Sequence, residues 1–181
     1  LGQGQSYHLL NGILKGATIS ASKPVQAHLI TGDINASYES RWYTLYPFEQ
    51  WGDSYITPVG TATNGQECYV FVYNPNPASI QIDYTTKIGS GNFSVGAGAA
   101  FQWEVPQLSG AKLASAGNEI FFALATAGAD PNENRTYDWG FTLVPENALT
   151  SQAVVGWGPG SSDLSQNGSP VWVSPVGPTR V

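Results

Sequence analysis

Two histidines, His8 and His28, are the only imidazole groups that the chain offers for acid–base catalysis. Both alternate with apolar neighbours, as strand residues do, and no Gly-x-Ser-x-Gly turn supplies a nucleophile. The glutamates Glu104, Glu119 and Glu146 have no neighbours in sequence that mark a carboxylate pair for glycoside hydrolysis. We therefore interpret the histidines as sheet residues and expect no enzyme, and a secreted hydrolase is the least supported function.

One run of oxygen-bearing side chains has a spacing suited to a metal ion. Asp130, Asn132 and Asn134 occupy alternate positions, and Asp138 follows. Calcium takes about six to eight oxygen ligands, and a calcium loop opens with this spacing. The glycine and the closing glutamate of such a loop are absent, and Asx turns in a solvated loop explain the same residues. We therefore favour a solvated loop and expect no cofactor, with calcium as the one alternative.

Aromatic residues form 12% of the chain and offer a different chemistry, the stacking of ring faces on sugars. The candidate ligand-binding residues are tryptophans near expected strand ends or loops: Trp42, Trp139, Trp157 and Trp172. Tryptophan is mostly buried in folded proteins, so core packing explains each of them as well. A carbohydrate-binding module is therefore the alternative to a purely structural role.

The elements that must position these residues are short strands. Short β-prone runs alternate with Gly, Pro and Asn along the chain, and strongly periodic helical stretches are missing. Short helical turns are expected at 48–51 and 145–149. Strands are expected at 6–10, 17–21, 25–31, 41–45, 54–58, 68–73, 79–85, 92–95, 101–105, 112–115, 119–126, 139–144, 152–157 and 170–174. This pattern predicts an all-β fold with a β-sandwich-like architecture.

The chain also contains a degenerate internal repeat. Residues 16–22 are echoed at 110–116, and residues 43–47 at 141–145. A repeated backbone plan is typical of structural and binding modules, whereas an active site is usually a single constellation. We therefore expect two tandem repeats packed together, the first over residues 1–94 and the second over residues 95–181.

The second repeat is expected to be incomplete at its C-terminal end. The strand at 79–85 has no counterpart after 170–174. A sandwich that lacks a strand exposes an unpaired edge, which is an aggregation liability unless it is covered. The cover would come from more of the same polypeptide or from a neighbouring subunit, unless the repeat simply ends differently. The expected assembly edge consists of Val171, Trp172, Val173 and Ser174.

Charge and composition restrict the location and the partners. Charged residues form 11% of the chain, against about 25% in an average domain, and the net charge is −6. The seven basic residues are scattered, so neither nucleic acid nor a polybasic membrane contact is expected. No apolar run is long enough to insert into a bilayer. A low charge with many small polar residues is common in secreted and cell-surface β proteins, so we expect an extracellular location.

The single cysteine and the glycosylation sequons add two expectations. Cys68 is the one cysteine, so the chain cannot form an internal disulfide. We interpret Cys68 as a buried small hydrophobe. Four Asn-x-Ser/Thr sequons are glycosylation candidates, although ordinary polar loop residues explain them equally well. These candidates are Asn35, Asn92, Asn134 and Asn167.

An ordered series of short motifs resembles a known family. The series is Ser22-Lys23-Pro24-Val25, Leu45-Tyr46-Pro47, Trp51-Gly52, Tyr55 and Thr57-Pro58. It resembles the N-terminal domain family of the IgG Fc-binding protein and related microbial surface proteins, mainly over 16–84, with a degenerate echo over 110–176. The resemblance implies an all-β extracellular module of adhesive or mucin-like proteins rather than a catalyst. Many relatives carry cysteines, whereas this chain has one. Their disulfide bonding therefore does not extend to this chain.

These observations predict a non-catalytic, extracellular structural or adhesive β module. We expect it to be a subunit or segment of a cell-surface or filamentous assembly that associates through sheet edges, with strand donation between subunits as one form. Its partners would be further copies of itself or a larger surface protein, and a glycan is the alternative ligand.

Overall fold

The computed structural model describes residues 1–9, 12–31, 41–58, 60, 67–127, 140–156, 158, 162–165 and 173–180. Strands and two short 3₁₀ turns are the only regular elements in these parts of the chain, so the predicted all-β class is confirmed. The elements are β1 (His28–Thr31), β2 (Arg41–Thr44), η1 (Phe48–Gln50), β3 (Ser54–Ile56), β4 (Cys68–Tyr73), β5 (Ile80–Thr86), β6 (Gly89–Val95), β7 (Ala100–Val105), β8 (Ala111–Ser115), β9 (Phe122–Ala127), β10 (Gly140–Thr142) and η2 (Glu146–Ala148).

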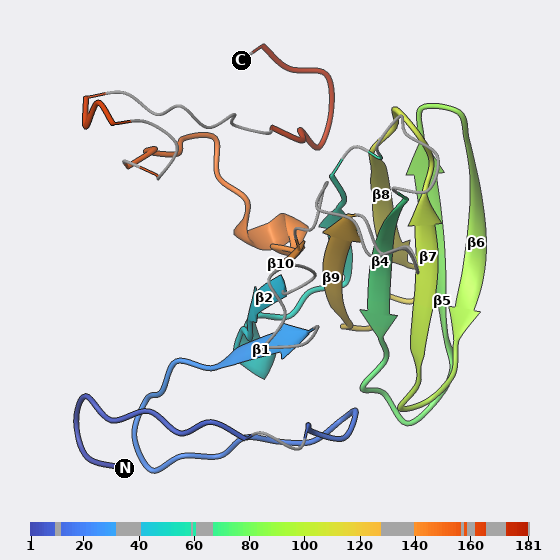
Figure 1. Cartoon of the computed structure of the whole chain (residues 1–181). Coiled ribbons are helices and arrows are strands. Elements are labelled where there is room, and N and C mark those ends of the chain that lie inside the picture. The colour runs from blue at the N-terminus through green and yellow to red at the C-terminus, as the bar shows by residue number, and fades with distance from the viewer. Residues whose placement is uncertain are drawn as a thin grey trace.

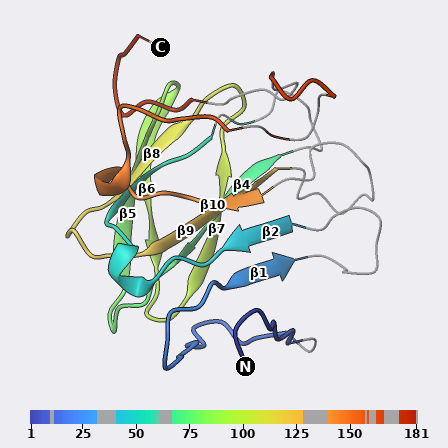
Figure 2. The same cartoon turned by 90° about the vertical axis from the view of Figure 1, so that its left-hand side faces the viewer.

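The strands form two packed antiparallel sheets and a ribbon. The first sheet has the order β10-β9-β4-β7, and the second has the order β3-β8-β5-β6. The ribbon pairs β1 with β2, and β2 lies alongside β10 in both views of the molecule (Figures 1 and 2). The predicted β-sandwich architecture is therefore confirmed.

The core forms between the two sheets because apolar residues alternate along the strands. In β4 the side chains of Cys68, Val70 and Val72 are buried, and in β5 those of Ile80 and Ile82 are buried. Each such aliphatic side chain contributes about 1.5–3 kcal/mol when it leaves water. The prediction that Cys68 is a buried small hydrophobe is confirmed.

Three of the predicted strands are absent, which corrects the sequence analysis. The described residues of 6–10, all of 17–21 and residues 152–156 of the third run are irregular and exposed. A strand needs a hydrogen-bonded neighbour, and a β-prone run without one does not form a stable element. The first and last parts of the chain therefore run as irregular arms beside the sandwich, as Figure 1 shows for the blue and the orange-to-red segments.

The two expected repeats contribute strands to both sheets. β4, which precedes residue 94, pairs with β7 and β9, which follow it, and β3 likewise pairs with β8. The boundary between the repeats therefore remains a prediction. The echo of residues 43–47 at 141–145 nevertheless ends in the same local conformation in both places. Pro47 (φ −53°, ψ 147°) precedes η1 and Pro145 (φ −65°, ψ 151°) precedes η2, so both predicted helical turns are confirmed.

A buried asparagine joins the connections between the two sheets. Asn74 follows β4 and is completely buried. Its Nδ2 lies 2.8 Å from the carbonyl oxygen of Ala78 and 3.0 Å from those of Val95 and Gly96. Its backbone N–H donates to the carbonyl oxygen of Ala99 at 3.0 Å. This one residue therefore fixes the β4–β5 connection against the β6–β7 turn.

The neighbouring Asn76 extends this polar cluster. The Oδ1 of Asn74 accepts hydrogen bonds from the backbone N–H and the Nδ2 of Asn76, each at 2.8 Å. The Nδ2 of Asn76 also donates to the carbonyl oxygen of Ile120 at 2.9 Å, just before β9. Because an unpaired buried polar group is costly, these bonds matter more than their modest net strength suggests.

Asn74→Ala is expected to lower the free energy of unfolding by about 3 kcal/mol, because it removes a fully buried amide that donates to three backbone carbonyl oxygens and accepts two hydrogen bonds from Asn76. Chemical denaturation followed by tryptophan fluorescence measures this loss. Asn92→Ala, which changes an exposed asparagine on β6, is the matched control and should stay within about 0.5 kcal/mol of the wild type. Equal effects of the two substitutions would contradict a central role for Asn74.

Candidate functional site

The predicted calcium residues lie outside the described residues. This applies to Asp130, Asn132, Asn134 and Asp138, so the calcium loop stays a prediction. In the part of the chain that the structure describes, no group of three or more His, Cys, Asp or Glu side chains is placed to hold a metal ion.

Of the four predicted ligand-binding tryptophans, Trp42 is described and Trp139, Trp157 and Trp172 lie outside the described residues. Trp42 lies on β2 with 61% of its surface exposed, and its ring is tilted against His28 at 6.2 Å between centroids. Near it, Thr44 Oγ1 lies 3.4 Å from His28 Nδ1. Trp42 is therefore accessible at the surface, and its role in ligand binding stays a prediction.

The two histidines have different surroundings. His28 lies on β1, as predicted for a sheet residue. His8 lies in the irregular and exposed N-terminal arm, so its prediction as a sheet histidine is wrong. The arm contains no strand in its described residues, and the alternation of apolar residues around His8 therefore has no sheet to face.

The glycosylation and edge candidates are only partly described. Asn92 lies on β6, opposite Asp83 of β5, and is exposed. Asn35, Asn134 and Asn167 lie outside the described residues, as do Val171 and Trp172 of the predicted assembly edge. Val173 and Ser174 have no regular structure, and the edge at 171–174 remains a prediction.

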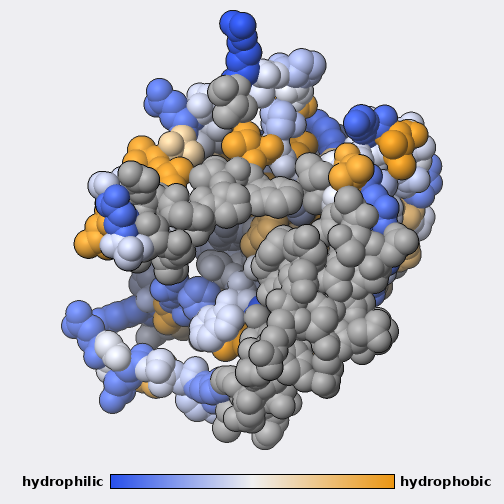
Figure 3. All heavy atoms as spheres, turned by 45° about the horizontal axis from the view of Figure 1, so that its top comes forward, coloured by the Kyte–Doolittle hydropathy of each residue, from blue (hydrophilic) through white to orange (hydrophobic). Residues whose placement is uncertain are grey.

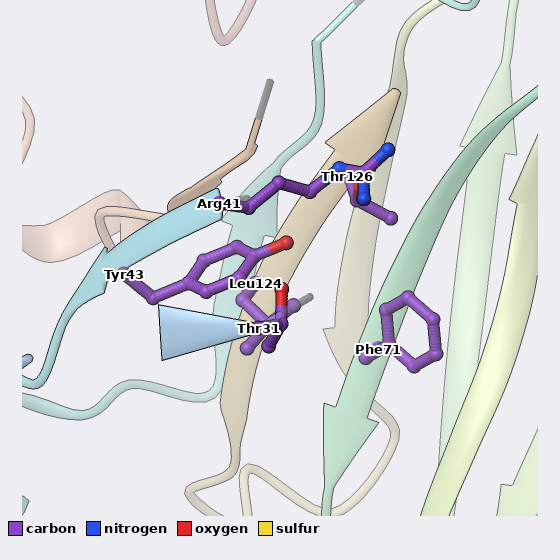
Figure 4. A pocket seen from close by; sticks show the side chains of 6 residues that line it. All are labelled: Thr31, Arg41, Tyr43, Phe71, Leu124 and Thr126. Atoms are coloured by element: carbon purple, nitrogen blue, oxygen red, sulfur yellow. The ribbon is translucent and has the colours of Figure 1, made fainter. Parts of the chain in front are cut away.

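A cavity of about 300 Å³ opens where the β1–β2 ribbon meets the first sheet (Figure 4). It lies on the face of that sheet turned away from the core, because Phe71 alternates with the buried Val70 and Val72. The Nη2 of Arg41 donates to the carbonyl oxygen of Ala127 at 3.1 Å, beside the cavity. The lining residues are Thr31, Arg41, Tyr43, Phe71, Leu124 and Thr126.

The lining of this cavity is mainly apolar, with a few hydroxyl-bearing side chains. Two aromatic rings and a leucine provide apolar surface, and Thr31, Tyr43 and Thr126 provide hydroxyl groups. Trp42 alternates with Tyr43 along β2 and so points to the opposite face of the ribbon, away from the cavity. Sequence reasoning missed the cavity, because its residues come from four strands that only the fold brings together.

Aromatic side chains also close the side of the sandwich where β6 and β7 lie. Phe93 of β6 stacks on Phe101 of β7 with 4.6 Å between centroids and 17° between planes. Tyr84 and Trp103 pack beside them at 5.1 Å. β6 and β7 are consecutive strands on different sheets, so both sheets end on this side. Among the described residues, no strand pairs with the outer edge of either one.

Two glutamates that looked ordinary in sequence have defined partners. Glu146 on η2 accepts a hydrogen bond from Ser54 Oγ at 2.6 Å and forms an ion pair with Lys112 Nζ at 2.7 Å. The Lys112 ammonium, followed by the Ser54 hydroxyl, holds the pKa of Glu146 below its ordinary value. Glu119 accepts from Ser115 Oγ, which lowers its pKa, in the turn after β8. These bonds fasten turns to strands, and a carboxylate with a lowered pKa is a poor general base.

Three motif residues of the N-terminal half, Trp51, Gly52 and Tyr55, form part of the frame of the fold, whereas Val25 of the first motif is exposed and lies outside any strand. The Nε1 of Trp51 donates to the carbonyl oxygen of Tyr46 at 3.1 Å. Tyr55 is buried, its hydroxyl donates to the carbonyl oxygen of Phe121 at 2.7 Å, and burial raises its pKa to about 12. A Cβ on Gly52 would lie 2.5 Å from the Cβ of Pro145, so only glycine fits there.

The comparison with protein families agrees with the resemblance that these motif residues carry. The family model described as IgGFc binding protein matches residues 1–162. The chain belongs to this family. The match confirms the resemblance drawn from the sequence and extends it over most of the chain. Searches of curated proteins and of solved structures returned no match.

Membership of the IgGFc binding protein family makes the chain an extracellular binding or structural module. The family is one of binding domains and not of enzymes. No helix in the described ranges is long and apolar enough to cross a bilayer. Because Trp51, Gly52 and Tyr55 serve the frame, the shared motif does not by itself locate a ligand site.

Glu146→Gln is expected to lower the stability at pH 7 by about 0.5–1 kcal/mol, because it removes the ion pair with Lys112. The lowered pKa means that this stabilisation is complete above pH 4.5, the ordinary value, and is lost as the pH falls through the folded-state pKa. Urea unfolding at pH 7 and pH 3 should therefore show a deficit that shrinks in acid.

Glu49→Gln, the matched change on the exposed face of η1, should alter stability by less than about 0.5 kcal/mol at pH 7. A Glu146→Gln deficit that is equally large at both pH values would show that the ion pair is not its source.

Proposed function

We propose that this chain is a non-catalytic adhesive or structural module that joins a cell-surface or filamentous assembly through its sheet edges. The observation that carries the proposal is the pair of edge strands, β6 and β7, at one side of the sandwich. Such an edge presents backbone N–H and C=O groups to any extended strand that approaches it.

The other two sheet edges are covered by the chain itself. Tyr55 of β3 forms a bridge with Pro145, and η2 packs beside this strand. At β10, a Cβ on Gly140 would collide with the Tyr43 phenol, and Thr142 Oγ1 donates to the carbonyl oxygen of Thr44. The chain therefore protects two edges and leaves two without a strand partner in the described structure.

Neither open edge has the residues with which soluble proteins usually block such pairing. Proteins protect edges with lysine, proline or inward-pointing charges. β6 and β7 contain no lysine and no proline, and Glu104 is their one charged residue. Edges of this kind favour a function in association.

The assembly test is sedimentation of the purified chain over a wide concentration range. The weight-average mass is expected to rise with concentration. Introducing lysine on both edges, as Ser94→Lys with Gln102→Lys, should weaken the association at least about tenfold. Gln81→Lys, which lies opposite Ser94 on the inner strand β5, is the matched control. A chain that stays monomeric at every concentration, or an assembly that ignores both edge lysines, would refute the proposal.

A carbohydrate-binding module is the second candidate, and the exposure of Trp42 favours it. Ring faces with nearby hydroxyl and imidazole groups match the apolar faces and hydroxyls of sugars. The cavity beside Tyr43 and Phe71 also places aromatic rings near hydroxyl groups, on the other face of the ribbon. In this role the module would attach a cell surface to a glycan.

Glycan-array binding followed by tryptophan fluorescence titration tests this second function. Trp42→Ala is expected to weaken binding at least about tenfold, since stacking on an aromatic face is lost. Phe48→Ala, which removes another exposed ring, is the control and should bind normally. No binding to any arrayed glycan, or equal binding by both variants, would exclude Trp42 as a glycan platform.

A further inference from the structure

One segment of the C-terminal arm has the sequence of a strand but forms none. Residues 152–155 read Gln-Ala-Val-Val, and β-branched residues favour extended, paired backbone. In the structure they are irregular and exposed, and 99% of the Val154 surface is accessible. Figure 3, which brings the upper side of Figure 1 forward, likewise shows apolar side chains at the surface in several separate places.

The internal echo gives this segment a counterpart that is paired. The repeat sets the sequence of residues 56–60, Ile-Thr-Pro-Val-Gly, over that of residues 154–158, Val-Val-Gly-Trp-Gly. Val154 therefore aligns with Ile56, which ends β3 and lies opposite Lys112 of β8. The earlier copy of the motif is therefore held in a sheet, and the later copy is not. Residues 152–155 form a β-prone segment without a sheet, and β6 and β7 are sheet edges without a partner strand in the described structure. Each could supply what the other lacks.

β6 is the edge that suits this segment best. It has seven residues, and none of them is charged or is proline. Residues 152–155 are also uncharged, so pairing places no like charges opposite each other. β7 offers a shorter edge that carries Glu104. Beside the β6 edge, the Phe93–Phe101 stack is only partly buried, and 38% of the Phe101 surface is exposed.

The β6 edge of the same copy is on the wrong side of the molecule. Glu146 holds η2 beside β3 through Ser54 and Lys112, and residues 152–155 follow shortly after η2. β8 and β5 stand between β3 and β6 in the second sheet. Figure 1 accordingly shows the arm leaving on the side of the molecule opposite β6.

We propose that residues 152–155 of one copy add as a strand to the β6 edge of a second copy. This inference rests on the proposed association through sheet edges and names its two surfaces. Because side chains alternate along a strand, one of Val154 and Val155 would cover the Phe93–Phe101 stack. Donor and acceptor surfaces differ, so the contact is head-to-tail and builds closed rings or open filaments.

Two single substitutions separate the donor from the acceptor. Val154→Asp places a charge in the donor, at a position so exposed that the monomer fold is unaffected. Ser94→Lys places a charge on the acceptor edge. Each is expected to reduce the association constant at least about tenfold in sedimentation velocity. The controls are Val176→Asp, at another exposed valine of the arm, and Gln81→Lys. The protein is produced without N-glycosylation, because Asn92 lies on β6.

Mixing the two variants is the decisive measurement. The Val154→Asp copy keeps an intact β6 edge, and the Ser94→Lys copy keeps an intact donor. At concentrations at which each variant alone stays monomeric, a mixture should therefore form one-to-one dimers and nothing larger. If the wild type does not associate, the proposed function itself fails. If the wild type associates and Val154→Asp associates equally well, or if the mixture forms no dimer, only the strand donation is refuted.

Discussion

The fold depends on one buried amide. Asn74 satisfies the backbone of two connections at once, the one that carries the chain from β4 to β5 and the one that carries it from β6 to β7. Both connections pass from one sheet to the other. The spacing between the sheets, and with it the stacking of Phe93 on Phe101, is therefore set at the end of the sandwich where Asn74 lies. Apolar burial drives the sheets together, but it is not directional. The hydrogen bonds of the Asn74 amide are directional, and they fix how the two connections lie against each other.

The sequence predicted the strands of the sandwich well, because their apolar residues alternate and their neighbours exist. β4 was predicted with its observed bounds, and β5 was displaced by one residue. The arms were predicted wrongly for the same physical reason: local alternation around residues 6–10, 17–21 and 152–157 says nothing about whether a partner strand is available. The proline-initiated turns at Pro47 and Pro145 were predictable, since the residues that fix them are adjacent in sequence.

The candidate sites were much less accessible to sequence reasoning. The cavity joins Thr31, Tyr43, Phe71 and Leu124, which are far apart in the chain. Asn74, like Glu146, gives no signal in sequence because its partners are backbone atoms and side chains brought close by the fold. The family motif was visible because it is local and ordered. Of its residues, Trp51, Gly52 and Tyr55 hold the frame, whereas the arms and the cavity lie outside this motif.

The interleaving of the strands has a consequence for how the module can be inherited or divided. β4 has neighbours only from the later part of the chain, and β8 and β9 each pair with a strand from the earlier part. A gene fragment that ends near residue 94 would encode strands without their partners, and so would the complementary fragment. The sandwich must therefore be transferred, recombined or lost as a single unit.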